Sequence, residues 1–133
     1  MPRFAVRRLD DIPRVPDSAF PWYPLQHHFG LTAFGANLFA AEAPGDELVE
    51  EHDETASGQE ELYLVLSGAA VFVLDGDEYE AAAVTAVAVG EPAVRRRATA
   101  LEAGTTVLVV GGEARGEFRS TWRAEWFERV PRA

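Results

Sequence analysis

The chain has 133 residues, 47% of them hydrophobic, with 12 basic and 22 acidic residues and a formal net charge of −10. This length suits a single domain with a buried core, and the negative charge argues against a nucleic-acid partner, because a phosphate backbone attracts basic surfaces. The sequence contains no cysteine and no lysine, which excludes disulfides, cysteine-bound zinc, a thiol nucleophile and a lysine Schiff base.

The sequence gives no sign of membrane association. No apolar run approaches the roughly 18 residues that a membrane-spanning helix needs. The N-terminal segment contains proline and arginine and lacks the apolar stretch of a secretion signal. We therefore expect no contact with a membrane and a cytoplasmic location.

Residues 1–30 are expected to form an irregular arm. The prolines of this segment prevent a long helix and weaken any central strand. The arm also carries an unusual number of aromatic residues, namely Phe20, Trp22, Tyr23 and Phe29. Such a segment is more typical of a strap packed on the core, or of an arm that contacts a second subunit, than of a free tail.

The central part of the chain is a series of short strands separated by turns. We expect strands over residues 31–43, 47–54, 59–66, 69–74, 79–81, 84–89, 93–100 and 105–110. The Asp75-Gly76 pair between two of these runs is a strong hairpin signal. Short strands at a spacing of roughly ten residues, with almost no helix, predict an all-β barrel or double-sheet roll.

The tail after residue 112 is rich in aromatic residues. Ser120 could cap a short helix in which Trp122 and Trp126, four positions apart, would share one face. We expect this helix to pack on the outside of the barrel.

Polar residues cluster at the ends of two of the predicted strands. Side chains alternate between the faces of a strand, so His52 and Glu54 would share one face, and Glu61 and Tyr63 would share another. Glu61 begins a strongly apolar strand, where a charge needs a partner. We interpret these side chains as pointing into a barrel. A solvated strand end is the alternative, because residues 46–61 contain eight acidic residues and no arginine.

Residues 45–68 resemble the first sequence motif of the cupins, G-x5-H-x-H-x3,4-E-x6-G. Gly45, His52, Glu61 and Gly68 take four of its positions, and the spacing from Glu61 to Gly68 agrees with the motif. Glu54 replaces the second histidine. The segments before His52 and between Glu54 and Glu61 are longer than in the motif.

The second cupin motif, G-x5-P-x-G-x2-H-x3-N, is only partly present. Pro92 matches its proline. Val94 stands at its second glycine, Arg97 at its histidine and Leu101 at its asparagine. This resemblance implies that residues 1–133 form one cupin domain, a double-stranded β-helix or jelly-roll barrel. Its core would span about 31–112, between an arm of residues 1–30 and a tail of residues 113–133. It also implies pairing into a homodimer.

Many cupins hold a divalent metal with three histidines and one glutamate. Here His52, Glu54 and Glu61 offer one imidazole and two carboxylates, a workable ligand set for Mn, Fe, Ni or Zn. Arg97 argues against a metal, because a guanidinium is a fixed cation that would repel a divalent ion and neutralise a glutamate instead.

The three consecutive arginines are candidate ligand-binding residues. Alternation places Arg95 and Arg97 on one face of a strand and Arg96 on the other. One or two guanidinium groups inside the barrel would favour an anionic ligand, whereas an internal Arg–Glu pair is equally consistent with the pattern. Tyr63 and Trp22 are candidate pocket aromatics, although core packing is the commoner role of such residues.

Three functions remain open. The one we favour is the binding of a small organic molecule, which could be an anion, without a full metal-ligand set, through Tyr63, Arg95 and Arg97. The second is a metal-dependent dioxygenase, isomerase or lyase that uses the histidine and the two glutamates. The third is a mainly structural homodimer, which the aromatic segments at both ends would support. Cupins carry out many unrelated activities, so the resemblance does not choose among these functions.

Overall fold

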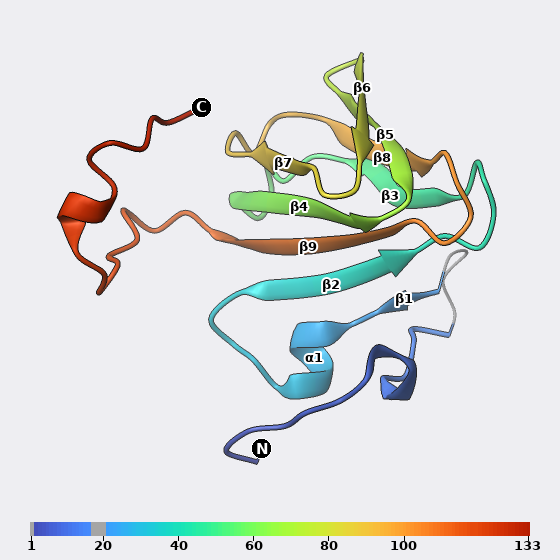
Figure 1. Cartoon of the computed structure of the whole chain (residues 1–133), viewed down its shortest axis with the longest axis horizontal. Coiled ribbons are helices and arrows are strands. Elements are labelled where there is room, and N and C mark those ends of the chain that lie inside the picture. The colour runs from blue at the N-terminus through green and yellow to red at the C-terminus, as the bar shows by residue number, and fades with distance from the viewer. Residues whose placement is uncertain (1, 17–20) are drawn as a thin grey trace.

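The computed structural model describes residues 2–16 and 21–133, which leaves Phe20 of the aromatic arm outside the described ranges. Nine strands form two antiparallel sheets in this part of the chain (Figure 1). In spatial order, the five-stranded sheet contains β1 (Trp22–Tyr23), β2 (Gly35–Ala40), β9 (Thr106–Glu113), β4 (Gln59–Ser67) and β7 (Ala86–Val89). The four-stranded sheet contains β3 (Glu47–His52), β8 (Arg96–Ala100), β5 (Ala69–Leu74) and β6 (Asp77–Ala82).

The chain passes repeatedly from one sheet to the other. After β2 it enters the four-stranded sheet with β3, returns with β4, leaves again with the β5–β6 hairpin, and repeats this exchange with β7, β8 and β9. Only the neighbouring strands β1–β2 and β5–β6 are consecutive in sequence. The predicted all-β double-sheet roll is confirmed, and the sheets enclose the core between them.

Side-chain alternation along β4 shows which face is internal. Tyr63 and Val65 are buried, whereas Leu62 and Leu66 on the opposite face are exposed. The same alternation buries Val107 and Val109 of β9. Residues of the four-stranded sheet complete the core, among them Leu48, Val49, Ala70, Phe72, Ala98 and Ala100.

Gly68 closes the turn between β4 and β5. Its φ of +71° lies in the left-handed region, and a Cβ at this position would collide with Oγ1 of Thr105. Thr105 is completely buried, and its Oγ1 lies 2.8 Å from the carbonyl oxygen of Glu102 and accepts a bond from the backbone N–H of Ala69. The glycine that ends the first motif is therefore required by close packing between two turns.

The N-terminal arm packs along β2 and is less irregular than the sequence suggests. It contains a short 3-10 turn, η1 (Leu9–Asp11), the strand β1, and a one-turn helix, α1 (Leu25–Phe29), which follows Pro24 and ends at Gly30. Ile12 is buried, and Gln26 accepts a hydrogen bond from the backbone N–H of Ala36. Proline is compatible with a helix start, so the prolines limited the length of this helix without preventing it.

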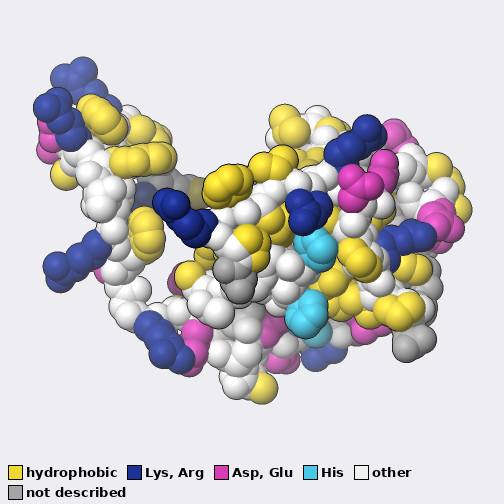
Figure 2. All heavy atoms as spheres, turned by 90° about the horizontal axis from the view of Figure 1, so that it is seen from below, with side chains coloured by type: hydrophobic (Ala, Val, Ile, Leu, Met, Phe, Trp, Pro, Cys, Tyr) yellow, Lys and Arg dark blue, Asp and Glu magenta, His cyan; other side chains and the backbone are white. Residues whose placement is uncertain are grey.

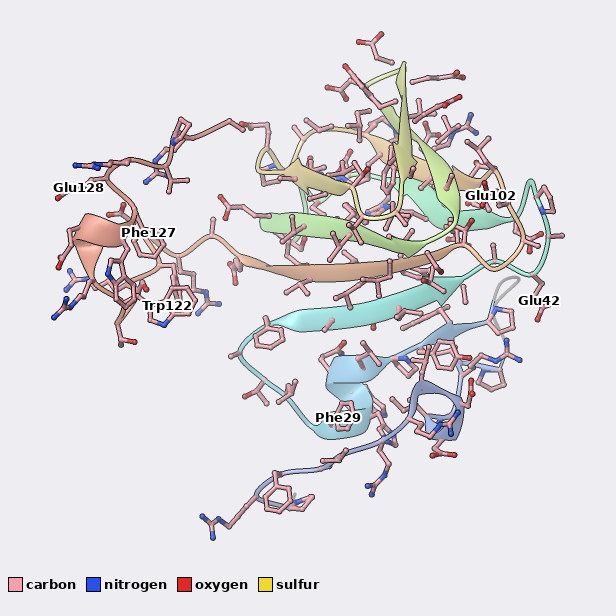
Figure 3. All side chains as sticks on the ribbon, viewed as in Figure 1. Phe29, Glu42, Glu102, Trp122, Phe127 and Glu128 are labelled. Carbon is pink, nitrogen blue, oxygen red and sulfur yellow. The ribbon has the colours of Figure 1, made fainter. Side chains whose placement is uncertain are left out.

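The C-terminal tail does not pack on the barrel as expected. Residues 113–133 are exposed and leave the end of β9 as an extended segment (Figure 1). Their single helical element is a 3-10 turn, η2 (Ala124–Trp126), in place of the expected α-helix. Trp122 stacks on Phe127, with ring centroids 6.2 Å apart, instead of pairing with Trp126 (Figure 3). Figure 2 shows the tail as a separate lobe that carries basic and hydrophobic side chains. No helix in the described part of the chain is long and apolar enough to cross a membrane.

Candidate metal and ligand site

A polar cluster lies between the two sheets, at the end of the barrel where β4 begins and β9 ends. His52 is the last residue of β3, Glu61 and Tyr63 belong to β4, and Arg96 is the first residue of β8. Glu54 joins them from the loop after β3. His52 and Arg96 are partners in the β3–β8 register, which places their side chains on the same face.

Glu61 is held by two donors. Its Oε1 accepts hydrogen bonds from the Tyr63 hydroxyl at 2.7 Å and from Nη1 of Arg96 at 2.8 Å. The Arg96 side chain is 0% exposed and that of Glu61 is 10% exposed. Burial, and then the bond to Glu61, raise the pKa of Tyr63 well above its ordinary value, so this phenol keeps its proton and donates it.

The remaining donors of Arg96 are bound to the backbone. Nε and Nη2 lie 3.0 and 2.9 Å from the carbonyl oxygen of Val94, and Nη2 also contacts that of Pro92 at 3.1 Å. A guanidinium arranged in this way is directed at Glu61 and at the turn before β8. Its Nε and Nη2 donors and one N–H of Nη1 are thus used within the protein.

His52 presents one nitrogen to two carboxylates. Its Nδ1 lies 2.7 Å from the carbonyl oxygen of Glu50, which can only accept, so Nδ1 carries a proton. Its Nε2 lies 3.1 Å from Oε1 of Glu54 and 3.5 Å from Oε1 of Glu61. One ligand atom from each of these three residues lies within 4.8 Å of the others. The structure thus brings together the three metal-ligand candidates that the sequence indicated.

Glu54 is positioned by the loop that exceeds the motif length. Its backbone N–H donates to the carbonyl of Pro92 at 2.8 Å, which ties the loop to the turn before β8. Its carbonyl accepts from Gly58 at 2.7 Å, and its side-chain Oε2 accepts from the Ser57 hydroxyl. The additional residues therefore form a turn that returns a hydroxyl group to this carboxylate.

A cavity of about 370 Å³ opens next to this cluster, between β2 and β3. His52 belongs to the cavity and to the polar cluster, because it lines the cavity and contacts the two glutamates. Trp22 and Phe39 lie in the wall with their ring centroids 5.9 Å apart. Asn37 also lines the cavity, and its Oδ1 is shielded from solvent without a hydrogen-bond donor among the described residues. The remaining lining residues are Glu47, Leu48, Val49, Glu50 and Glu51.

No family model and no curated protein matches the sequence, but solved structures match the fold. A cupin protein from Bacteroides fragilis aligns with a TM-score of 0.70 over 91% of this chain and 93% of that chain, at 20% identity. The chain has the cupin fold. A cupin-superfamily sugar phosphate isomerase from Silicibacter pomeroyi aligns with a TM-score of 0.66 over 82% of this chain and 76% of that one, at 23% identity. The nucleoside dehydratase Pac13 from Streptomyces aligns with a TM-score of 0.57 over 80% and 81%, at 17% identity.

The arginine inside this cupin barrel is Arg96, where the sequence argument had selected Arg95 and Arg97. These two do share a face, as alternation required, but that face is the outer one. Arg97 is exposed, and Arg95 lies 3.6 Å from both Glu51 and Asp53 at the surface. The pKa of Asp53 is lowered, mainly by the backbone N–H of Thr55 and also by Arg95.

A signal for the internal arginine was present in the sequence. Arg96, Ala98 and Ala100 are all buried, so the small apolar residues at every second position mark the inner face of β8. Counting motif positions from Pro92 selected Arg97 instead, because the short turn after this proline does not follow the spacing of the second cupin motif. Tyr63 is the other proposed ligand-binding residue. It is buried in the core, where its hydroxyl binds Glu61 and its ring packs edge-on against Phe72 with centroids 5.5 Å apart.

Proposed function

We propose that this cupin binds a divalent metal ion with His52, Glu54 and Glu61 and acts on a small molecule held in the adjacent cavity. The observation that supports this proposal is the orientation of His52. Its Nδ1–H donates to a backbone carbonyl, which leaves Nε2 facing two carboxylates. In the neutral imidazole the lone pair of Nε2 would face two anions, an arrangement that a metal ion between them, or a proton on Nε2, would stabilise.

The donor set suits such an ion. The backbone carbonyl of Glu50 supplies the outer hydrogen bond that fixes the tautomer of a metal-binding histidine. Ser57 binds Oε2 of Glu54, so Oε1, which faces His52, is left to coordinate. Oε1 of Glu61 faces His52 and already accepts from Tyr63 and Arg96, so Glu61 would coordinate through the remaining electron pairs of its carboxylate. One imidazole and two carboxylates are acceptable to Mn, Fe, Ni and Zn.

The chain's own residues would orient and hold protons around the ligand. Tyr63 and Arg96 fix Glu61 in one position, and Glu54, whose side chain is 18% exposed, lies nearer to solvent and could accept a proton from the ligand. A bound divalent ion supplies Lewis acidity, which polarises a carbonyl or hydroxyl oxygen. Because two structurally similar cupins are described as an isomerase and a dehydratase, we place isomerase or lyase chemistry ahead of oxygenation.

Metal analysis tests this proposal. Untagged protein, never exposed to a nickel column, is analysed for metals and then titrated with Mn, Fe(II), Ni and Zn after treatment with a chelator. We expect one ion per chain, and an affinity that falls by more than about 100-fold in His52→Ala and Glu54→Gln, since a lost ligand costs more than a lost outer-shell partner. The control is Glu80→Gln, an exposed glutamate of β6 outside the cluster and the cavity, which should bind metal normally. Failure to bind any of the four ions would refute the proposal.

A second candidate is the metal-free ligand-binding protein favoured by the sequence. The Arg96–Glu61 pair supports it, because a guanidinium 2.8 Å from Glu61 already neutralises one of the carboxylates. A proton on Nε2 of His52 would then bridge to Glu54 in place of a metal. In this case the protein would contain no metal, and His52→Ala would weaken ligand binding equally with and without chelator.

A further inference from the structure

The cavity beside His52 contains a buried acceptor without a donor. Oδ1 of Asn37 is shielded from water and has no hydrogen-bond partner among the described residues. A buried polar atom left in this condition costs free energy, because water no longer satisfies it and no protein group replaces water. Asn37 lines the cavity, so a rotation of its side-chain amide would let a molecule bound there supply the missing N–H or O–H group.

The wall next to Asn37 is aromatic. Trp22 pairs with Phe39 in the β1–β2 register, and their rings are tilted by 46° with centroids 5.9 Å apart. Aromatic faces contribute large apolar contact area and favour ring-bearing ligands. The cavity volume of about 370 Å³ lies within the range of small-molecule sites.

The charges around the cavity disfavour an anion. Glu47 and Glu50 belong to its lining, together with Glu51, whose carboxylate lies 3.6 Å from Arg95 at the surface. Arg96, the arginine inside the barrel, uses its donors on Glu61 and on backbone carbonyls, so it offers no free fork to a carboxylate or phosphate. An incoming anion would therefore meet the carboxylates of Glu47 and Glu50, which form no ion pair among the described residues, on the side of the cavity away from His52.

We infer that the cavity takes an uncharged ring compound that packs on Trp22 and Phe39 and donates a hydrogen bond to Oδ1 of Asn37. The inference rests on the proposed function, since the ligand held here is the molecule presented to His52. It replaces the anionic ligand that the three arginines suggested with a neutral hydrogen-bond donor.

Three small probes test this inference on the full chain. Benzamide is uncharged and carries N–H donors, N,N-dimethylbenzamide is uncharged and has none, and benzoate is an anion. Each is titrated against ¹⁵N-labelled protein, with chemical-shift changes as the readout. We expect benzamide to bind about threefold to tenfold more tightly than either other probe, which is the range that one hydrogen bond supplies.

The variant that isolates the hydrogen bond is Asn37→Leu. It should bind benzamide and dimethylbenzamide with equal affinity, whereas Trp22→Leu should weaken both without removing the preference. Equal binding of benzamide and dimethylbenzamide by the unaltered protein, or tighter binding of benzoate, would overturn the inference. The comparison of probes decides the matter even if Asn37→Leu does not fold.

The titrations are run on chelator-treated and on metal-loaded protein, which separates the two proposals. A benzamide preference without metal binding would support the cavity inference and reject the metal. Metal binding without a benzamide preference would support the metal site and reject the cavity inference.

Discussion

Arg96 and Glu61 form an ion pair that is almost completely removed from water. Their side chains are 0% and 10% exposed, and Nη1 lies 2.8 Å from Oε1. Such a pair contributes little net stability when intact, because desolvation of both charges offsets their attraction. Its loss is costly, since the remaining charge stays buried without a partner.

Arg96→Met should therefore lower the free energy of unfolding by about 3–5 kcal/mol, as measured by urea denaturation. The matched control is Arg97→Met at the next position, which is exposed and should change stability by less than about 0.5 kcal/mol. The double variant Arg96→Met/Glu61→Leu removes both charges and should recover a large part of the loss. Equal stability of the two single variants would show that the inward arginine carries no structural role.

For single residues, the sequence predicted the residue types of the site but not which of the three arginines points into the barrel. His52, Glu54 and Glu61 could be selected because a strand places alternate side chains together and because the motif fixed their order. The internal arginine could not be selected by motif spacing, because the turn between Pro92 and β8 sets the phase of that strand. The Asn37–Trp22–Phe39 wall joins segments whose contact depends on the register of β1 with β2, which the sequence did not reveal.

Two glycines at the end of β9 differ in what surrounds them. Gly111 pairs with Glu61 of β4, and a Cβ on it would lie 3.1 Å from Cγ of Glu61 and 3.2 Å from the carbonyl oxygen of Glu60. Gly112, on the opposite face, has no atom within 4 Å of the same position. The missing side chain at Gly111 therefore leaves the space in which Glu61 lies.

Gly111→Ala should displace Glu61 and weaken metal binding by about tenfold or more, as expected when a ligand loses its position. Isothermal titration with whichever of Mn, Fe(II), Ni and Zn binds to the unaltered protein measures this effect. Gly112→Ala changes the same strand by the same methyl group and should leave the affinity unchanged. Loss of binding in both variants would point to a general effect on β9 rather than to Glu61.

The strands were the most predictable elements, because each combines apolar alternation with turn residues at both ends. Their limits shifted where alternation was weak: β2 begins at Gly35 and not at residue 31, and β8 begins at Arg96 and not at residue 93. The two-residue strand β1 and the helix α1 were not predicted, since their stability comes from contact with β2 and not from local pattern. The tail was expected to be helical because its tryptophans are four residues apart, but an isolated short helix is unstable without a surface to pack on.

The whole molecule separates its charges. Residues 114–133 contain five arginines and three acidic residues, which gives this tail a net charge of +2. Because the whole chain has a net charge of −10, residues 1–113 carry −12. The same tail exposes its large apolar side chains, with Phe118 89% and Trp122 68% exposed. A basic, aromatic tail beside an acidic body is complementary to the body of a second copy of this chain.

We therefore expect the homodimer that the sequence suggested, with each tail lying on its partner. Sedimentation equilibrium of the full chain should give a dimer at micromolar concentration. Trp122→Ser/Trp126→Ser should shift it to monomer, whereas Tyr79→Ser, which removes another exposed aromatic from β6, should not. A monomer at all concentrations, or a tail that contacts its own barrel in solution, would contradict this arrangement.

Strand β3 lies at the edge of its sheet, so the glutamates that it contributes to the cavity, Glu50 and Glu51, have a second effect. A marginal strand presents unpaired backbone groups that can recruit a strand from another molecule and start aggregation. Glu50 and Glu51 are exposed on this strand, and their charge opposes such pairing. Ligand selection and colloidal solubility thus depend on the same carboxylates. An attempt to retune the cavity by replacing them with apolar residues would produce a protein that precipitates, whereas lysine would change the preferred ligand and keep the margin protected.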